Sequence, residues 1–254
     1  MPLHVERRGR VGILTLDDPE RRNALTQQIV DAITAAVATF EADDGVGAIV
    51  VTGAPPAFCS GADVSALTGL ASAGRDPGDV REIYAGFLRV LDCPLPTIAA
   101  VNGPAVGAGF NLALACDVRI AGTSARFDAR FLRIGIHPGG GHTWLLDRAV
   151  GPQAAAAMNL FGERLDGERA AAIGLAWECV PDADLLDRAA ELAARAADAP
   201  RELAMRVKAS LRHAVWQPTF DDALRFELEH QVWSFRQPEF SERMRTPKDK
   251  SRPN

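Results

Sequence analysis

The chain has 254 residues, 47% hydrophobic and 24% charged, with a formal net charge of −5. This balance predicts a soluble globular protein of one large or two smaller domains and excludes disorder. It also excludes general nucleic-acid binding, since contacts to the phosphate backbone need a basic face. The four cysteines are scattered, with no C-x-x-C pair and no histidine at ligand spacing, so we expect reduced thiols and no metal site. No apolar signal segment opens the chain and no apolar run approaches about 18 residues, which predicts a cytoplasmic protein without membrane partners.

The N-terminal part predicts a hairpin, a helix, a strand and a second helix, in that order. Residues 4–16 contain two apolar segments around Arg8-Gly9-Arg10, which is a hairpin signal. Thr26 can cap a helix whose apolar side chains fall on one face. The apolar run at residues 48–52 predicts a buried strand, and residues 80–91 predict an amphipathic helix.

The rest of the chain is organised around residues 97–117, TIAAVNGPAVGAGFNLALACD. Residues 98–101 have the continuous apolar character of a strand buried on both faces. Four residues should then break any regular element: Gly103, Pro104, Gly107 and Gly109. A helix is predicted to begin near Gly107. Its small first residues would leave backbone N–H groups uncovered at the positive end of the helix dipole, where an anion or a developing oxyanion can bind.

This turn has two alternative interpretations, a dinucleotide-binding loop and a turn that serves packing alone. Gly107-Ala108-Gly109 resembles the start of a dinucleotide fingerprint, but the third glycine would fall at Leu112 and no acidic residue follows at the right distance. The glycines could also serve only for close packing of a helix on a strand. A second small-residue turn, residues 57–64, follows the strand at 48–52 and argues against both. Two such turns give two backbone donors that could converge on one oxygen.

The remaining sequence continues the alternation and then becomes helical. Strands are predicted at 117–121, 125–128 and 176–180, and helices at 153–161 and 167–174. This alternation indicates an α/β fold with a parallel sheet. From residue 183 onward the apolar residues recur at helical spacing, and helices with so much apolar surface need a partner.

Three motifs in order resemble the crotonase (enoyl-CoA hydratase/isomerase) superfamily: PERRNAL at 19–25, AFCSGAD at 57–63 and AVNGPAVGAGFNLALACD at 100–117. The resemblance implies an α/β crotonase-like spiral of ββα units at residues 1–197, with the CoA pocket and oxyanion hole, and a C-terminal helical trimerisation region at 198–254. It implies a homotrimer or hexamer. It implies no cofactor beyond the coenzyme A that is part of an acyl-CoA substrate.

The resemblance also assigns site residues. The oxyanion hole falls on the backbone N–H groups of Ala62 and Ala108, and Arg21 or Arg22 becomes a contact of the CoA phosphates. The substrate-binding residues carried over are Arg22, Ala24, Cys59, Ser60, Gly61, Ala62, Asp63, Val64, Gly107 and Ala108.

The sequence departs from the family where hydratases carry two glutamates, since those positions hold Asn111 and Phe131. Neither side chain titrates, and the loss of a general acid or base costs about 10²–10⁴ in rate, so ordinary hydration should be slow. His137, in the Pro-Gly loop of residues 131–143, is the first candidate for a substitute acid or base. Bonding of His137 to the backbone alone is an equal alternative. The second choices are Asp128, Arg130 and His142.

Two function classes follow. The first is an enzyme of lipid metabolism, a lyase or isomerase, that stabilises an enolate of a fatty acyl-CoA or enoyl-CoA thioester. Its acid and base residues would be atypical. Isomerisation or thioester hydrolysis through His137 or Asp128 belongs to this class. The second is a non-catalytic acyl-CoA-binding protein.

Overall fold

The computed structural model describes residues 2–63, 77–214 and 219–245. The chain divides into two compact units, Met1–Asp198 and Ala199–Asn254. The sequence also predicts a helix directly after the 57–64 turn, and those residues lie outside the described ones.

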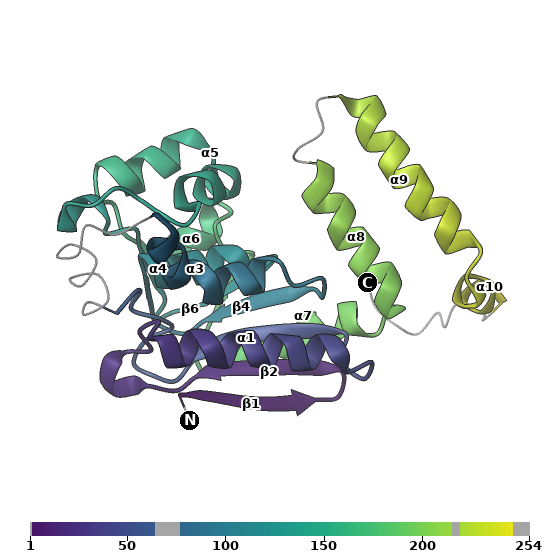
Figure 1. Cartoon of the computed structure of the whole chain (residues 1–254), viewed down its shortest axis with the longest axis horizontal. Coiled ribbons are helices and arrows are strands. Elements are labelled where there is room, and N and C mark those ends of the chain that lie inside the picture. The colour runs from purple at the N-terminus through teal and green to yellow at the C-terminus, as the bar shows by residue number, and fades with distance from the viewer. Residues whose placement is uncertain (1, 64–76, 215–218, 246–254) are drawn as a thin grey trace. The chain divides into compact units, whose positions relative to one another are not determined.

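The first unit is built on a mixed sheet of six strands, in the order β1-β2-β3-β4-β6-β9 (Figure 1). Only the first pair is antiparallel; every later neighbour is parallel. The strands are β1 (Leu3–Arg8), β2 (Val11–Leu16), β3 (Ala48–Gly53), β4 (Thr97–Val101), β6 (Val118–Gly122) and β9 (Glu178–Val180). The predicted hairpin, buried strands and parallel sheet are confirmed.

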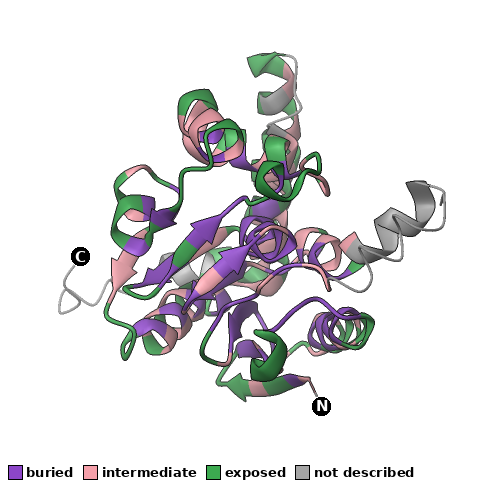
Figure 2. Cartoon of the chain, turned by 90° about the vertical axis from the view of Figure 1, so that its left-hand side faces the viewer, coloured by how far each residue is buried: buried purple, intermediate pink, exposed green. Residues whose placement is uncertain are grey.

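Helix α7 (Leu185–Ala197) covers one face of this sheet. Its buried residues recur every four positions, at Leu185, Ala189, Ala193 and Ala197, and join one apolar core with side chains of the central strands. The small side chains let the helix approach closely: a Cβ on Gly47 would lie 2.7 Å from the Ala197 Cα. Figure 2 shows the buried strands at the centre of this unit.

Helices α1 (Gln27–Ala42), α3 (Pro77–Leu91) and α4 (Ala108–Ala115) lie on the other side. In β2, Val11 and Ile13 point toward α7, so Gly12 between them faces the other side of the sheet. A Cβ on Gly12 would lie 2.6 Å from the Phe40 ring of α1, which places α1 on that opposite face. Thr26 caps α1 as predicted, its Oγ1 accepting from the Ile29 N–H at 3.3 Å. Helix α3 packs on α1 and α4.

A second sheet of three short strands was not predicted. It contains β5 (Pro104–Val106), β7 (Arg126–Asp128) and β8 (Leu165–Asp166), in that order. The prediction that Gly103, Pro104 and the following glycines break all regular structure is therefore wrong at β5. Parallel pairing with β7 and a bridge between Cys59 and Ala105 override the weak local propensity.

Helix α5 (His142–Leu160) is longer than the predicted helix at 153–161. Gly151 has φ 76° and ψ 169°, outside the helical region, and Pro152 follows it. The element is thus two helical segments joined at a kink, and the Gly-Pro pair concealed the first. Helix α6 (Gly167–Ala172) begins after the Asp166 cap, and short 3₁₀ turns occur at Pro19–Arg21 and Leu132–Ile134.

The second unit consists of α8 (Arg201–Ala214), α9 (Phe220–Phe235) and α10 (Pro238–Arg245). Arg206 of α8 ties it to α9: its guanidinium lies 4.0 Å from the Trp233 ring centroid and 3.0 Å from His230 Nδ1. Large apolar side chains remain exposed on these helices: Val207, Leu211, Phe220, Leu224, Leu228, Val232, Phe235 and Phe240. Within the described part of the chain, no helix is long and apolar enough to span a membrane.

Candidate active site

A cavity of about 230 Å³ opens in the first unit where the two small-residue turns meet. Its described lining is mostly apolar and contains no carboxylate. The residues are Ser60, Gly61, Ala62, Tyr84, Val106, Gly107, Ala108, Asn111, Ala129, Arg130, Phe131, Ile134, Ile136, His137 and Gly139. Five residues proposed from sequence for the chemistry, Ala62, Ala108, Asn111, Phe131 and His137, thus lie on one cavity.

Strand β5 holds the two turns side by side. The Cys59 N–H donates to the Pro104 carbonyl at 3.1 Å, and the Val106 N–H donates to the Cys59 carbonyl at 3.0 Å. Gly61, with φ 105°, approaches so closely that a Cβ on it would lie 2.7 Å from the Val106 carbonyl oxygen and 3.6 Å from the Ala108 nitrogen. Only glycine fits here without moving the backbone.

Two backbone N–H groups at the turns donate to no acceptor among the described residues. Ala108 is the first residue of α4, so its N–H has no partner within the helix. In residues 2–63, 77–214 and 219–245, neither the Ala108 N–H nor the Ala62 N–H donates to an acceptor. Both residues line the cavity, and backbone N–H groups of this kind are the donors that an oxyanion hole uses.

The loop before α1 is fastened to the first turn. The Ser60 N–H donates to the Arg22 carbonyl at 3.0 Å, and the Leu25 N–H donates to the Gly61 carbonyl at 2.8 Å. Asn23 is buried with φ 57°, and its Nδ2 donates to the Ala54 and Ala57 carbonyls at 2.8 and 2.7 Å. Sequence patterns did not single out Asn23, whose one signal is that asparagine tolerates this left-handed backbone.

The other described residues that were predicted to bind substrate belong to the first turn or to the loop before α1, and they do not line the cavity. Arg22 is exposed, and Ala24 and Cys59 are buried outside the cavity lining. Burial raises the pKa of the Cys59 thiol to about 12, so it stays protonated. Asp63 is half-buried, and Val64 lies outside the described residues.

Asn111 is fixed at both ends of its amide. It is 1% exposed on the first turn of α4; its Nδ2 donates to the Gly139 carbonyl at 2.9 Å, and its Oδ1 lies 2.7 Å from His142 Nδ1. Phe131 packs on the same histidine, with ring centroids 4.9 Å apart. The two positions without glutamate therefore meet at His142, which does not line the cavity.

The candidate acids and bases separate into two environments. His137 is exposed and lines the cavity, and its Nδ1 lies 2.7 Å from the Pro138 carbonyl, which leaves Nε2 unbonded to any described residue. Asp128 is 5% exposed, does not line the cavity, and accepts through Oδ2 from Arg130 at 3.0 Å and Arg133 at 2.7 Å. Its backbone carbonyl instead accepts from the Gly107 N–H at 3.0 Å and so supports the second turn.

Tyr84 also lines the cavity. Its ring centroid lies 5.6 Å from that of Phe87, and burial raises the pKa of its phenol. The apolar side chains Ile134 and Ile136 complete the wall. No apolar periodicity marked either isoleucine as part of a site, because Ile134 ends a short 3₁₀ turn and Ile136 lies in the loop after it.

Burial lowers the pKa of His142 to about 4, so its imidazole is neutral at physiological pH. A histidine in the unfolded chain has a pKa of about 6.5. At pH values between the folded and the unfolded pKa the unfolded chain binds more protons than the folded chain, so the folded state loses stability as pH falls. Relative to a His142→Phe variant, the wild type should lose about 2–3 kcal/mol between pH 7.5 and 4.5. Denaturant unfolding at both pH values measures this difference; parallel pH profiles for the two proteins would contradict it.

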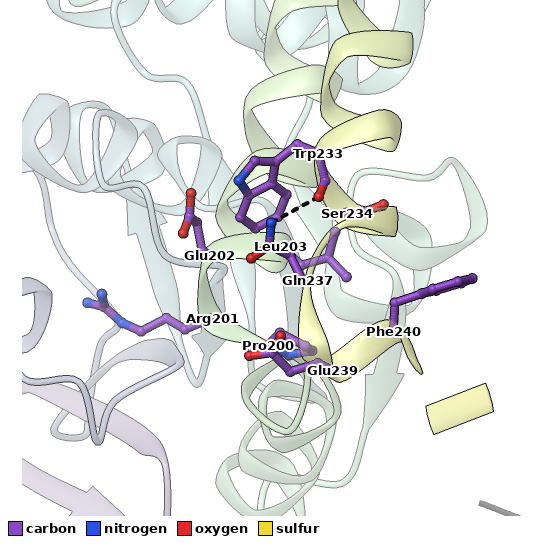
Figure 3. Close-up of a pocket in the computed structure, with 9 residues that line it drawn as sticks. All are labelled: Pro200, Arg201, Glu202, Leu203, Trp233, Ser234, Gln237, Glu239 and Phe240. Atoms are coloured by element: carbon purple, nitrogen blue, oxygen red, sulfur yellow. Dashed lines mark hydrogen bonds between the residues drawn. The ribbon is translucent and has the colours of Figure 1, made fainter. Parts of the chain in front are cut away.

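A second hollow, of about 360 Å³, lies among the helices of the C-terminal unit (Figure 3). Leu203, Trp233 and Phe240 contribute apolar surface, and Gln237 Nε2 donates to the Trp233 carbonyl at 2.9 Å. None of the residues proposed for the chemistry lies here. Among the described residues of the whole chain, no group of three or more His, Cys, Asp or Glu could hold a metal ion.

Comparisons with a family model, with related sequences and with solved structures all lead to enoyl-CoA hydratases and isomerases. The chain matches the family model of enoyl-CoA hydratase/isomerase over residues 6–254. A Mycobacterium tuberculosis H37Rv protein named "Probable enoyl-CoA hydratase EchA14" is 50% identical over 241 residues, covering 92% of each chain. The 1,2-epoxyphenylacetyl-CoA isomerase of Escherichia coli K12 is 34% identical over 243 residues, covering 94% of this chain and 91% of the isomerase. The enoyl-CoA hydratase crystal structure from Bacillus anthracis has a TM-score of 0.87 and 26% identity, covering 96% of this chain and 95% of that one.

Proposed function

Because this chain belongs to the enoyl-CoA hydratase/isomerase family of the crotonase superfamily, we propose that it binds a fatty acyl-CoA or enoyl-CoA thioester and stabilises an enolate of it in a backbone oxyanion hole. The observation that carries this proposal is the pair of unpartnered N–H groups, of Ala62 and Ala108, on one cavity of the described chain. Charge that develops on a thioester oxygen is stabilised by two preorganised donors, each contributing about 10²–10³ in rate.

The reaction should differ from ordinary hydration. Hydration needs one group to activate water at the β-carbon and another to protonate the α-carbon. Asn111 and Phe131 stand where the family's hydratases carry glutamates, and neither can transfer a proton. The described cavity wall offers no carboxylate. Crotonyl-CoA hydration by the wild type should therefore be slow.

His137 is the proposed acid or base. It is the one histidine among the described lining residues, and histidine is the residue type most often used for general acid–base catalysis. Its Nδ1 is occupied by the Pro138 carbonyl, so Nε2 is the atom available for proton transfer. We favour isomerisation or thioester hydrolysis through this imidazole over a role for Asp128, which does not line the cavity and whose carboxylate is bound by Arg130 and Arg133.

Removal of His137 tests this assignment. Against a panel of acyl-CoA and enoyl-CoA thioesters read by mass spectrometry, His137→Ala should lower the native turnover about 10²-fold, at the lower end for a general acid or base because water can reach an exposed site. The matched control is His4→Ala, an exposed histidine of β1 that does not line the cavity. Equal activity of both variants would reject His137.

A non-catalytic acyl-CoA-binding protein is the second candidate, favoured by the absence of carboxylates from the described cavity wall. Both functions require thioester binding, so affinity alone does not separate them. The thioester panel does: a wild-type protein that binds acyl-CoA but converts none of the thioesters would replace the enzyme proposal by the binding proposal.

We further propose a homotrimer or hexamer joined through the C-terminal helices. The support is the exposed apolar surface of α8 to α10, since soluble monomers rarely leave so much uncovered. Light scattering should give three or six times the protomer mass. Leu211→Asp, at a side chain 69% exposed, should lower that mass, whereas Leu160→Asp, at a leucine 63% exposed on α5, should not. A wild-type monomer at micromolar concentration would overturn the proposal.

A further inference from the structure

His142 is a buried, titratable side chain to which the proposed function gives no role. It is the first residue of α5, is 1% exposed, and lies between aromatic rings, with centroids 5.3 Å from Phe110 and 4.9 Å from Phe131. A phenylalanine or leucine could fill such an apolar site. The imidazole therefore needs a reason beyond packing.

The hydrogen bonds around Asn111 determine which atoms carry hydrogen. The Gly139 carbonyl can only accept, so the Asn111 amide nitrogen must face it, at 2.9 Å. This places Oδ1, an acceptor, toward His142 Nδ1 at 2.7 Å. Nδ1 must then carry the proton and donate. In the neutral ring the other nitrogen, Nε2, is a bare lone pair.

His142 Nε2 is buried and bonds to no described residue. A buried acceptor without a partner is unfavourable, and an apolar ring in its place would remove that cost. The unpartnered Nε2 thus destabilises the folded state, whereas Nδ1 makes a short hydrogen bond to Asn111. This asymmetry indicates that the bond to Asn111 is what the imidazole provides.

That bond holds a side chain of the cavity wall and the loop beside it. With His142 on Oδ1 and Gly139 on Nδ2, the Asn111 amide cannot turn over, so the remaining N–H and lone pair meet a ligand in one fixed arrangement. Gly140, with φ 66°, packs so closely that a Cβ on it would lie 3.1 Å from Asn111 Nδ2. The amide is therefore the point to which the loop carrying His137 is fastened.

We propose that His142 is a positioning residue for Asn111: its Nδ1–H fixes the amide, and through Gly139 the loop of residues 137–141, in the geometry that the thioester chemistry needs. This role rests on the proposed function, because it acts on residues of the same cavity. It involves no proton transfer by His142. The enzyme should use the neutral ring as a rigid donor.

Two substitutions separate the hydrogen bond from packing. His142→Phe keeps an aromatic ring and removes the hydrogen-bond donor. It should lower kcat about 10-fold or more and change KM less than about threefold. Its Tm should be unchanged or higher. His142→Asn loses the ring but keeps an N–H near the position of Nδ1, and should retain at least about a third of kcat despite a lower Tm. Activity would then rank opposite to stability. A fully active Phe variant with an inactive, folded Asn variant would overturn the proposal.

The matched control is Thr52→Val. It removes an equally buried hydrogen bond, from Thr52 Oγ1 to the Ala100 carbonyl at 2.8 Å, in the sheet and outside the cavity lining. It should leave kcat unchanged. A drop as large as that of His142→Phe would show that any lost buried bond has this effect and would reject a specific role for His142.

Nuclear magnetic resonance of ¹⁵N-histidine-labelled wild type gives a readout that needs no turnover. The Nδ1–H tautomer of His142 is expected, and the Nε2–H tautomer would overturn the proposal whatever the activity. If the wild type converts no thioester, the proposed function fails. In uniformly ¹⁵N-labelled protein the Asn111 side-chain amide signals then decide: a shift in His142→Phe that reverts in His142→Asn supports positioning, and unchanged signals reject it.

Discussion

Replacement of Ala108 by proline should lower thioester turnover about 10²- to 10³-fold, because it removes one of the two donors that we propose for the developing oxyanion. The substitution suits the backbone. Ala108 is the first helical residue of α4, where proline is well tolerated, and the preceding Gly107 is the residue type least restricted by a following proline. Affinity for free coenzyme A should fall much less, since it lacks the thioester carbonyl.

The chain offers a close control in Gln27→Pro. Gln27 is the exposed first residue of α1, capped by Thr26, and its N–H faces no cavity of the site. Both variants should keep a Tm close to that of the wild type. If Ala108→Pro retains turnover within about threefold while folded, the oxyanion assignment is wrong.

Carboxylates placed at positions 111 and 131 should raise an activity rather than lower it. Asn111→Glu combined with Phe131→Glu is expected to raise crotonyl-CoA hydration at least about 10²-fold above wild type, because each general acid or base contributes about 10²–10⁴. Both positions already line the cavity. The pair should act as a unit, since one carboxylate activates water and the other completes proton transfer, so neither single variant should gain comparably.

The structure also indicates what this double variant costs. Asn111→Glu removes the N–H that the Gly139 carbonyl accepts, and Phe131→Glu puts a carboxylate in place of a ring that is 9% exposed and packed on His142. Melting temperatures must therefore be measured beside the rates. The Asn111→Gln, Phe131→Gln pair, matched in size but without charge, should gain nothing. A folded glutamate pair that also gains nothing would mean that the cavity is shaped for another reaction or for binding alone.

Sequence patterns predicted the elements that local rules determine. The Thr26 cap, the apolar face of α1 and the buried runs of β3 and β4 follow from composition and period alone. The site residues Ala62 and Ala108 came from motif resemblance, and their unpartnered N–H groups in the described chain are consistent with the role proposed for them. The first half of α5 and the strand β5 were missed because glycine and proline locally contradict a structure that tertiary contacts impose.

Long-range polar contacts could not be predicted. His142 and Asn111 are 31 residues apart, and nothing in either segment specifies that a loop of glycines will bring them to 2.7 Å. The same holds for Asn23, which binds carbonyls more than 30 residues away.

The role of Asp128 depends on local backbone geometry, although its side chain alone makes it a candidate acid. Its pairing with Arg130 and Arg133 is visible only once the turn at Arg130, with φ 59°, is known.

Enolate stabilisation, the central claim, is tested most directly by α-proton exchange. Butyryl-CoA has no double bond to hydrate, so deuterium gained at its α-carbon in D₂O reports reversible enolate formation whichever reaction the enzyme normally completes. Mass spectrometry should show exchange by the wild type well above the protein-free rate, and a rate at least about 10²-fold lower for Ala108→Pro. Tight binding of butyryl-CoA by the wild type with no exchange above the protein-free rate would contradict the account.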